Sequence, residues 1–195
     1  MEESIKYYDK HCERFVRETF DIDMSSIYQP FLELIPVGGR LLDAGCGSGR
    51  DALAFSRLGF KVEAFDGSGR CAEQARKLTG LDVQQLRFDE VTFENEFDGI
   101  WACASLLHIR HDALDGVLDR FFRALREKGV AYLSFKEGRQ DTQKDGRYFT
   151  NFTLSEFDHW IGQSQGWVCL EAWLTEDMRP HRQNELWVNG LIKKI

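Results

Sequence analysis

A short apolar segment that runs directly into closely spaced glycines constrains this chain more than any other feature. The segment 40–44 (RLLDA) is mostly apolar, and Gly45, Gly47 and Gly49 follow it at alternate positions before a helical pattern begins. Glycines lack a Cβ, so they allow a tight turn and a close approach of the backbone to a ligand. A strand, turn and helix of this kind predict an α/β fold that binds a ligand beyond the carboxyl end of the strand.

The rest of the chain alternates in the same way between apolar and amphipathic stretches. Further strands are expected at 61–66, 83–88, 98–103, 130–135, 167–175 and 185–193, and helices at 5–19, 26–34, 51–58, 68–78, 112–128 and from 153 onward. This alternation predicts a Rossmann-like, seven-stranded mixed sheet with helices on both faces. The last two strands have no helix between them, so they should form an antiparallel hairpin. The polar stretch 136–148 is expected to be a mobile loop.

Size, cysteine content and charge narrow the class of protein. A chain of 195 residues with 43% apolar residues is predicted to form one domain over 1–195. Its 5 cysteines are scattered and form no CxxC pair, which favours a reducing, cytoplasmic setting. The longest mostly apolar run, 100–109, is too short to cross a membrane. The net charge of -7 argues against a nucleic-acid partner, and we expect a monomer or a weak homodimer.

An acidic residue stands at the carboxyl end of each of the first two predicted strands. Asp66 ends the second strand, where a carboxylate can accept hydrogen bonds from both hydroxyls of a ribose. Asp43, at the end of the first strand, should repel a pyrophosphate and suit an amino group. The spacing Gly47-x-Gly49-x-x-Ala52 also fits a dinucleotide site, so an NAD(P)-dependent oxidoreductase stays an alternative.

Three features occur together: the pattern acid-x-Gly-x-Gly-x-Gly, an acid at the end of the second strand, and a C-terminal antiparallel hairpin. In this combination the chain from about Gly38 to Ile195 resembles class I S-adenosylmethionine-dependent methyltransferases. The resemblance implies the strand order 3-2-1-4-5-7-6, with residues 1–36 forming helices that fold over the cofactor site. It also implies methyl transfer from S-adenosylmethionine to a small-molecule acceptor by direct displacement, and a non-catalytic protein that binds the cofactor is an alternative.

The segments FDGIWACASLLHI and GRYFT carry a narrower likeness. They are similar to segments of small bacterial methyltransferases related to tellurite-resistance proteins. This likeness says little about the acceptor.

The resemblance implies a role for each residue of the first two motifs. The methionine portion of the cofactor would lie over Asp43, Gly45, Gly47 and Gly49, and the ribose hydroxyls would bind Asp66. A tight turn between strand and helix would explain the glycines without a ligand, and Asp66 could instead cap a helix.

Further cofactor contacts are expected from three other segments. Phe88 and Asp89 would face the adenine, and Ala104 and Leu106, after the fourth strand, would line the other side. Tyr8, in the first helix, would present its ring to the sulfonium. Asp89 could equally be a solvated turn residue, and Tyr8 could simply pack.

The acceptor site is the least constrained part of the prediction. His108, after the fourth strand, is the candidate general base, with packing beside the pocket as the alternative. Lys136, Arg147 and Arg179 suggest an anionic acceptor, although neighbouring acids also fit a salt-bridged surface. No metal is expected, because His108 and His111 lack a cysteine or acid at ligand spacing.

Overall fold

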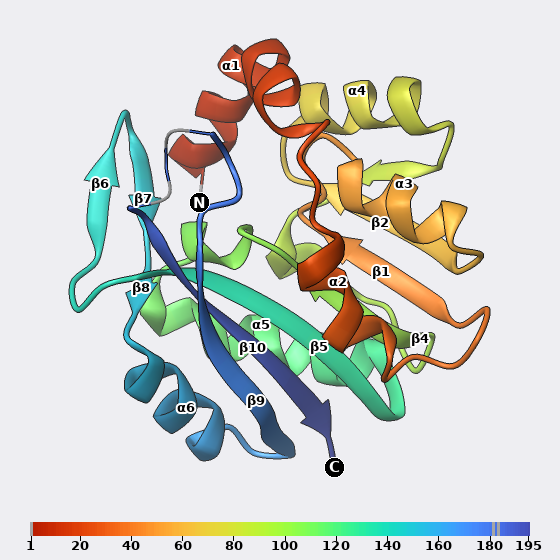
Figure 1. The fold of residues 1–195 in the computed structure, drawn as a ribbon, viewed down its shortest axis with the longest axis vertical. Helices are drawn as coiled ribbons and strands as arrows, with labels where there is room; N and C mark the ends of the chain where they lie inside the picture. Colours follow the sequence, from red (N-terminus) through yellow and green to blue (C-terminus); the bar gives the residue numbers. More distant parts are fainter. Residues whose placement is uncertain (1, 181, 183) are drawn as a thin grey trace.

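A central β-sheet with helices on both faces organises the chain (Figure 1). The computed structural model describes residues 2–180, 182 and 184–195. The helices are α1 (Glu2–Thr19), α2 (Ser25–Leu32), α3 (Arg50–Arg57), α4 (Gly69–Thr79), α5 (His111–Ala124) and α6 (Leu154–Gln163). The strands are β1 (Arg40–Ala44), β2 (Lys61–Asp66), β3 (Val83–Gln85), β4 (Phe97–Ala102), β5 (Leu125–Glu137), β6 (Thr142–Lys144), β7 (Arg147–Phe149), β8 (Asn151–Phe152), β9 (Trp167–Glu176) and β10 (Leu186–Lys194).

The main sheet has the order β3-β2-β1-β4-β5-β10-β9, and β10 is antiparallel to both of its neighbours. With β9 and β10 counted as the sixth and seventh strands, this is the order expected from the sequence. The sheet differs in detail because the short strand β8 also pairs with β5. The α/β fold class and the C-terminal antiparallel hairpin are therefore confirmed.

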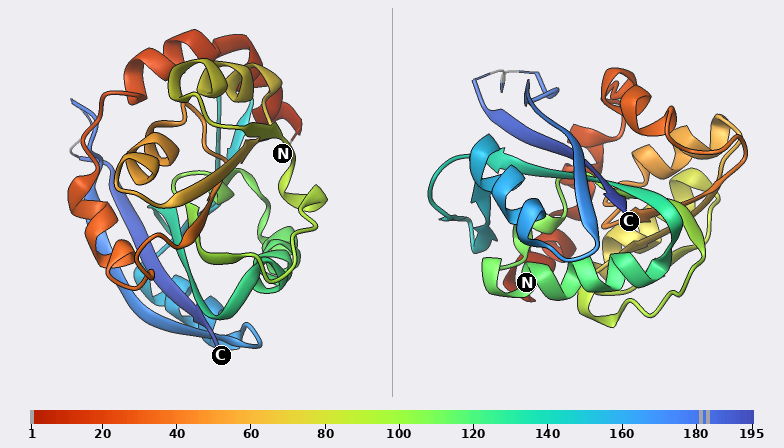
Figure 2. Two further views of the ribbon diagram at one scale, coloured as in Figure 1. Left: turned by 90° about the vertical axis from the view of Figure 1, so that its right-hand side faces the viewer. Right: turned by 90° about the horizontal axis from the view of Figure 1, so that it is seen from below.

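The two largest apolar cores lie on opposite faces of the sheet, because successive side chains of a strand point to opposite sides. On one face, α2 and α3 pack around Trp101, whose ring stacks on Tyr132 with 3.9 Å between centroids. On the other face, α5 and α6 bury Phe121 and Phe157 completely. The two views in Figure 2 show the sheet between these layers.

The predicted mobile loop over 136–148 is wrong, because most of it is regular structure. Strand β5 continues to Glu137, and β6 and β7 form an antiparallel hairpin. Lys144 pairs with Arg147, so Asp145 and Gly146 alone make the turn, with φ values of 52° and 78°. An Asp-Gly pair favours this tight hairpin turn, in which both central residues need positive φ.

Two predicted boundaries also shift. Strand β3 ends at Gln85 instead of Phe88, because Phe88–Glu90 forms a turn of 3-10 helix in which Arg87 and Glu90 satisfy each other's backbone groups. Helix α5 ends at Ala124 and β5 begins at Leu125, several residues before the predicted strand start. Strong apolar periodicity located both elements, but it did not fix where each one ended.

Helix α1 lies outside the two layers, where it packs against α4 and contacts β7 (Figure 1). Ser68 caps α4 by accepting a hydrogen bond from the amide of Cys71. Thr153 and Glu156 form a capping box at the start of α6. Across the described ranges, every helix is too short or too polar to span a lipid bilayer.

Candidate active site

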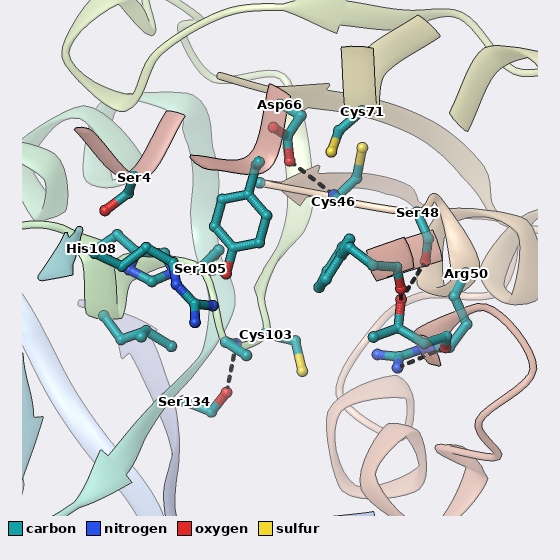
Figure 3. Close-up of a pocket in the computed structure, with 18 of the residues that line it drawn as sticks. Ser4, Cys46, Ser48, Arg50, Asp66, Cys71, Cys103, Ser105, His108 and Ser134 are labelled. Carbon is teal, nitrogen blue, oxygen red and sulfur yellow. Dashed lines mark hydrogen bonds between the residues drawn. The ribbon is translucent and has the colours of Figure 1, made fainter. Parts of the chain in front are cut away.

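A cavity of about 460 Å³ lies beyond the carboxyl ends of β1, β2, β4 and β5. The loops after these strands form one part of its wall, and α1, β7, β9 and β10 contribute the rest. Figure 3 shows Asp66 and Cys46 on one side of this space, with His108 and Ser134 on others. The volume falls in the range typical of small-molecule sites, and the position is the one expected for an α/β fold.

The glycine loop after β1 is held against the end of β2 by its own backbone. The amides of Gly45 and Cys46 both donate to the carbonyl of Phe65, each at 2.9 Å. Gly45 has φ 78°, and a Cβ there would come within 2.6 Å of the Ser105 Cβ. Only glycine therefore fits at this position. Gly45 and Gly47 both line the cavity, as expected.

Asp66 is the carboxylate that borders the cavity at the end of β2. Its Oδ2 accepts a hydrogen bond from the amide of Gly47, and its Oδ1 accepts one from the amide of Ser68, both at 2.8 Å. Burial raises the pKa of Asp66 to about 6, although these two hydrogen bonds act to lower it. Each oxygen keeps acceptor capacity for a ligand hydroxyl.

Asp43 and Gly49 do not line the cavity, unlike the rest of the predicted first motif. The Oδ2 of Asp43 accepts a hydrogen bond from the amide of Ala52 at 3.0 Å, in the first turn of α3. The carboxyl is buried, and this burial raises its pKa well above the usual value. Gly49 is the N-cap of α3 and packs against α4. Asp43 therefore fixes the turn from behind the loop, and of these two acids only Asp66 lines the cavity.

Four more of the residues predicted near the cofactor can be compared directly, and two of them line the cavity whereas two do not. Phe88 and Ala104 line the cavity. Asp89 lies outside it with a half-exposed side chain, where Arg87 forms two hydrogen bonds to it at 3.0 and 2.6 Å. Leu106 also lies outside, because it is fully buried in the apolar core under α5, and its neighbour Leu107 reaches the cavity instead.

His108 and Tyr8 line the cavity and bind each other there. The Tyr8 hydroxyl and the His108 Nε2 are 2.9 Å apart, and the Nδ1 lies 2.7 Å from the carbonyl oxygen of Tyr148. A carbonyl can only accept, so Nδ1 carries the proton and Nε2 accepts from Tyr8. Burial lowers the pKa of His108 to about 4. At neutral pH the ring is therefore uncharged, and its basic nitrogen faces Tyr8.

The three predicted basic residues all reach the cavity, but they differ in their partners. Lys136 forms an ion pair with Glu185. Arg179 forms a two-pronged pair with Asp177, whose side chain is only 4% exposed. His181, two positions after Arg179 in the sequence, lies outside the described residues. Arg147 is different, because its one ion-pair contact within the described part of the chain is longer, at 3.5 Å.

A buried polar network beside the glycine loop was not predicted. Arg50 lines the cavity and donates to both carboxylate oxygens of Asp51 at 2.6 and 3.0 Å. Tyr28 and Trp101 also donate to Asp51, the latter at 2.8 Å. Burial acts to raise the pKa of Asp51, but Arg50 outweighs it and holds the pKa below the usual value. The adjacent pair Arg50-Asp51 was visible in the sequence, but its partners from α2 and β4 were not.

The low pKa of His108 predicts that this residue destabilises the protein in acid. The unfolded imidazole has a pKa of 6.5 and the folded one about 4, so the unfolded state binds a proton first as pH falls. The contribution of neutral His108 to the free energy of unfolding is fully present above about pH 7 and is lost as pH falls towards 4. Wild type therefore loses about 2 kcal/mol of stability from His108 between about pH 7.5 and pH 5, and His108→Asn does not. The free energy of unfolding of the variant minus that of wild type should rise by this amount over the same pH change.

Urea unfolding at both pH values measures this difference. Asp66 titrates in the same range with the opposite sign, because its raised folded pKa adds stability as pH falls through 6 towards 3.8. That contribution is common to the variant and the wild type, so it cancels when the two are compared. A difference that stays constant with pH would contradict the assignment of a neutral, buried His108.

Comparison with known families matches most of the chain. A family model described as a methyltransferase domain matches residues 13–183. The solved structure of the 1,6-didemethyltoxoflavin-N1-methyltransferase of Burkholderia thailandensis, with bound 1,6-didemethyltoxoflavin and S-adenosylhomocysteine, superposes with a TM-score of 0.79 at 22% identity. The superposition covers 98% of this chain and 86% of that one, so the fold is shared along nearly the whole length.

Curated relatives match a shorter region. The S-adenosyl-L-methionine-dependent Diels-Alderase iccD of Talaromyces variabilis is 31% identical over 121 residues, which are 57% of this chain and 41% of that protein. An uncharacterized methyltransferase of Staphylococcus carnosus is 28% identical over 91 residues, which are 47% of this chain and 44% of that protein. The matches therefore span less than half of each relative.

Proposed function

Because the chain belongs to the methyltransferase domain family and has the class I S-adenosylmethionine-dependent fold, we propose that it transfers a methyl group from S-adenosylmethionine to a small-molecule acceptor. The observation that carries this proposal is a half-buried carboxylate, Asp66, beside a glycine loop at the edge of a cavity of about 460 Å³. The fold alone would allow many ligands, so the argument rests on the chemistry of this edge.

The residues at this edge fit the cofactor in three ways. Asp66 offers free acceptor capacity to the two ribose hydroxyls while it holds the amides of Gly47 and Ser68. The ring of Phe88, next to Gly45, offers an apolar wall to the adenine. The ring of Tyr8 can face a sulfonium, because aromatic faces attract cations. Asp43 contributes indirectly, because its hydrogen bond to Ala52 fixes the turn into α3.

S-Adenosylmethionine supplies an electrophilic methyl group when it is bound, so the protein must mainly align the acceptor and exclude water. The cavity continues from Asp66 past Ala104 and Ser134 to the walls formed by β7 and β10. This second part of the cavity is available to an acceptor of small size. Helix α1 lines one side, where the rings of Tyr8 and Phe15 pack edge to face with 5.1 Å between their centroids.

His108 would receive the proton that an acceptor hydroxyl or amine loses when it is methylated. The Nε2 of His108 already accepts the hydrogen bond of Tyr8. The acceptor proton therefore passes to the Tyr8 oxygen while Tyr8 gives its own proton to Nε2. The carbonyl of Tyr148 holds the opposite nitrogen at 2.7 Å and fixes the tautomer that this transfer needs.

Turnover in the presence of an acceptor library tests the proposal. The readout is S-adenosylhomocysteine, measured by liquid chromatography, together with label transferred from methyl-tritiated S-adenosylmethionine. We expect both to appear in equal amounts and only when an acceptor is present. One relative is named as a Diels-Alderase, which suggests cyclisation as the competing reaction. If a substrate is cyclised and no S-adenosylhomocysteine forms, the proposal of methyl transfer is overturned. Binding of the cofactor without either reaction would favour a sensor.

A further inference from the structure

Arg147 has an unusual environment for a cation in a cavity wall. Its guanidinium carbon lies 3.9 Å from the ring centroid of Tyr7, 5.1 Å from that of Phe149 and 5.8 Å from that of Tyr8. Only 17% of the side chain is exposed. The charge is therefore largely removed from water and sits among aromatic rings at the junction of α1 and β7.

The other arginines and lysines of the cavity wall have closer counter-ions or are more exposed to solvent. Arg50, Lys136 and Arg179 are largely buried, and each has a carboxylate of the described residues within 2.6 Å. Arg14, Arg87 and Arg182 also form ion pairs, but their side chains are 42% to 50% exposed, and Lys144 is exposed on the β6–β7 hairpin. Arg147 is thus a largely buried cation whose carboxylate partner among the described residues is distant, at 3.5 Å.

The one acidic contact of Arg147 is weak. Its Nη2 lies 3.5 Å from the Oδ2 of Asp145, whose side chain is 58% exposed in the hairpin turn. An exposed pair at this distance contributes little. The Nε of Arg147 is buried and has no hydrogen-bond partner among the described residues. Burial of a charged group without a matching partner is costly, so we expect an anionic ligand to bind the part of the guanidinium that the cavity exposes.

The geometry of the guanidinium limits what that ligand can be. A guanidinium stacked on an aromatic ring keeps its N–H groups in its own plane, where they point away from the ring. In this position it can bind the two oxygens of a carboxylate side by side. The aromatic side chains of Tyr7, Phe149 and Trp187 line the same part of the cavity and suit a flat, unsaturated body.

We propose that the methyl acceptor is a small, unsaturated or aromatic carboxylic acid whose carboxylate binds Arg147. The inference rests on the proposed function, because it assigns the acceptor to the part of the cavity that the cofactor leaves free. It also narrows the expectation from the sequence, since Lys136 and Arg179 are already neutralised by Glu185 and Asp177. One available positive charge suits a singly charged carboxylate better than a doubly charged phosphate.

Calorimetric titration of the full chain, saturated with S-adenosylhomocysteine, tests this assignment without turnover. The probes are benzoate, its neutral analogue benzamide, and phenyl phosphate. We expect benzoate to bind at least about tenfold more tightly than either of the others. Arg147→Gln should weaken benzoate binding at least about tenfold and leave benzamide binding within about twofold, because only the charged pair is lost.

Arg139→Gln is the matched control. It makes the same substitution at an exposed arginine outside the cavity, in the segment before β6. Benzoate affinity within about twofold of wild type is expected for this variant, since screening weakens exposed charges. Three results would overturn the inference: equal binding of benzoate and benzamide, equal losses in both variants, or no benzoate binding up to about 10 mM.

The titration also separates this inference from the proposed function. If S-adenosylhomocysteine fails to bind the wild type, the proposed function itself is contradicted. If it binds with unchanged affinity to wild type and Arg147→Gln, and benzoate does not distinguish them, only the carboxylate assignment fails. Folding of Arg147→Gln is checked in the same experiment by its S-adenosylhomocysteine affinity.

Discussion

Asp66→Asn is expected to weaken S-adenosylhomocysteine binding at least about tenfold. The carboxylate would accept charge-assisted hydrogen bonds from two ribose hydroxyls, each contributing about 1.5–3 kcal/mol. Asparagine has nearly the same size but only one acceptor oxygen, and this oxygen is needed by the amide of Gly47 or of Ser68. The variant therefore loses both the charge and the spare acceptor capacity.

The same residue predicts a pH dependence of binding. Burial raises the pKa of Asp66 to about 6, and the negative charge of Asp9 on α1 adds to this rise. Below that pH the carboxyl becomes neutral and accepts hydrogen bonds more weakly. Affinity for S-adenosylhomocysteine should be flat above about pH 7 and fall below about pH 6, by at most about tenfold per pH unit. Asp66→Asn should remove this dependence.

Calorimetry between about pH 5 and pH 8 measures both effects. Asp82→Asn is a suitable control, because it makes the same substitution in an exposed turn beyond α4. Its affinity and pH profile should match those of wild type. An Asp66→Asn variant that binds S-adenosylhomocysteine as wild type does would remove Asp66 from the cofactor site.

His108→Asn is expected to lower kcat by about 10²- to 10⁴-fold for an acceptor that must lose a proton. Asparagine can still donate to the Tyr148 carbonyl, but it offers no basic nitrogen to Tyr8. Because the pKa of His108 is about 4, its neutral form is present throughout the neutral range. Wild-type kcat should therefore show no loss from His108 between about pH 8 and pH 5.5.

Initial rates at saturating S-adenosylmethionine, together with cofactor affinity, check this expectation. Cofactor affinity of His108→Asn should stay within about threefold of wild type, which separates a catalytic defect from a folding defect. His159→Asn, on the exposed face of α6, is the matched control and should retain wild-type rates. A His108→Asn enzyme with rates within about threefold of wild type would leave His108 with a packing role only.

Much of the fold could be predicted because local patterns agree with the tertiary structure. The strand Lys61–Asp66 was predicted with its observed bounds, since a polar turn follows it and a glycine precedes it by two residues. The hairpin of β6 and β7 was missed, because each strand has only three residues and no apolar alternation. The Asp145-Gly146 pair carried the turn signal, but the polar composition around it favoured a loop.

The candidate site was predictable where a backbone position defines it and uncertain where a side-chain direction does. Gly45, Gly47 and Asp66 line the cavity because they follow the ends of β1 and β2. Asp43 belongs to the same motif, but its side chain points to the start of α3. Sequence spacing cannot distinguish these orientations. The likeness to tellurite-resistance-type proteins and the domain organisation with helices folded over the cofactor stay predictions.

Partners from distant segments were also invisible in the sequence. Nothing in the spacing indicates that Tyr8 meets His108, one hundred positions away, or that Glu185 neutralises Lys136 across the sheet edge. These contacts decide which charges a ligand would meet. They explain why three basic residues looked equivalent in the sequence and why Arg147 alone is the candidate partner of an anion.

Titration of the wild-type chain with S-adenosylhomocysteine and, separately, with NAD tests the central claim most directly. The proposed cofactor site predicts one S-adenosylhomocysteine per chain, and a stabilisation of about 2.7 kcal/mol when the ligand is present at a hundred times its Kd. NAD should neither bind nor stabilise. Binding of NAD without binding of S-adenosylhomocysteine would contradict the assignment of the glycine loop and Asp66 to a methyl donor.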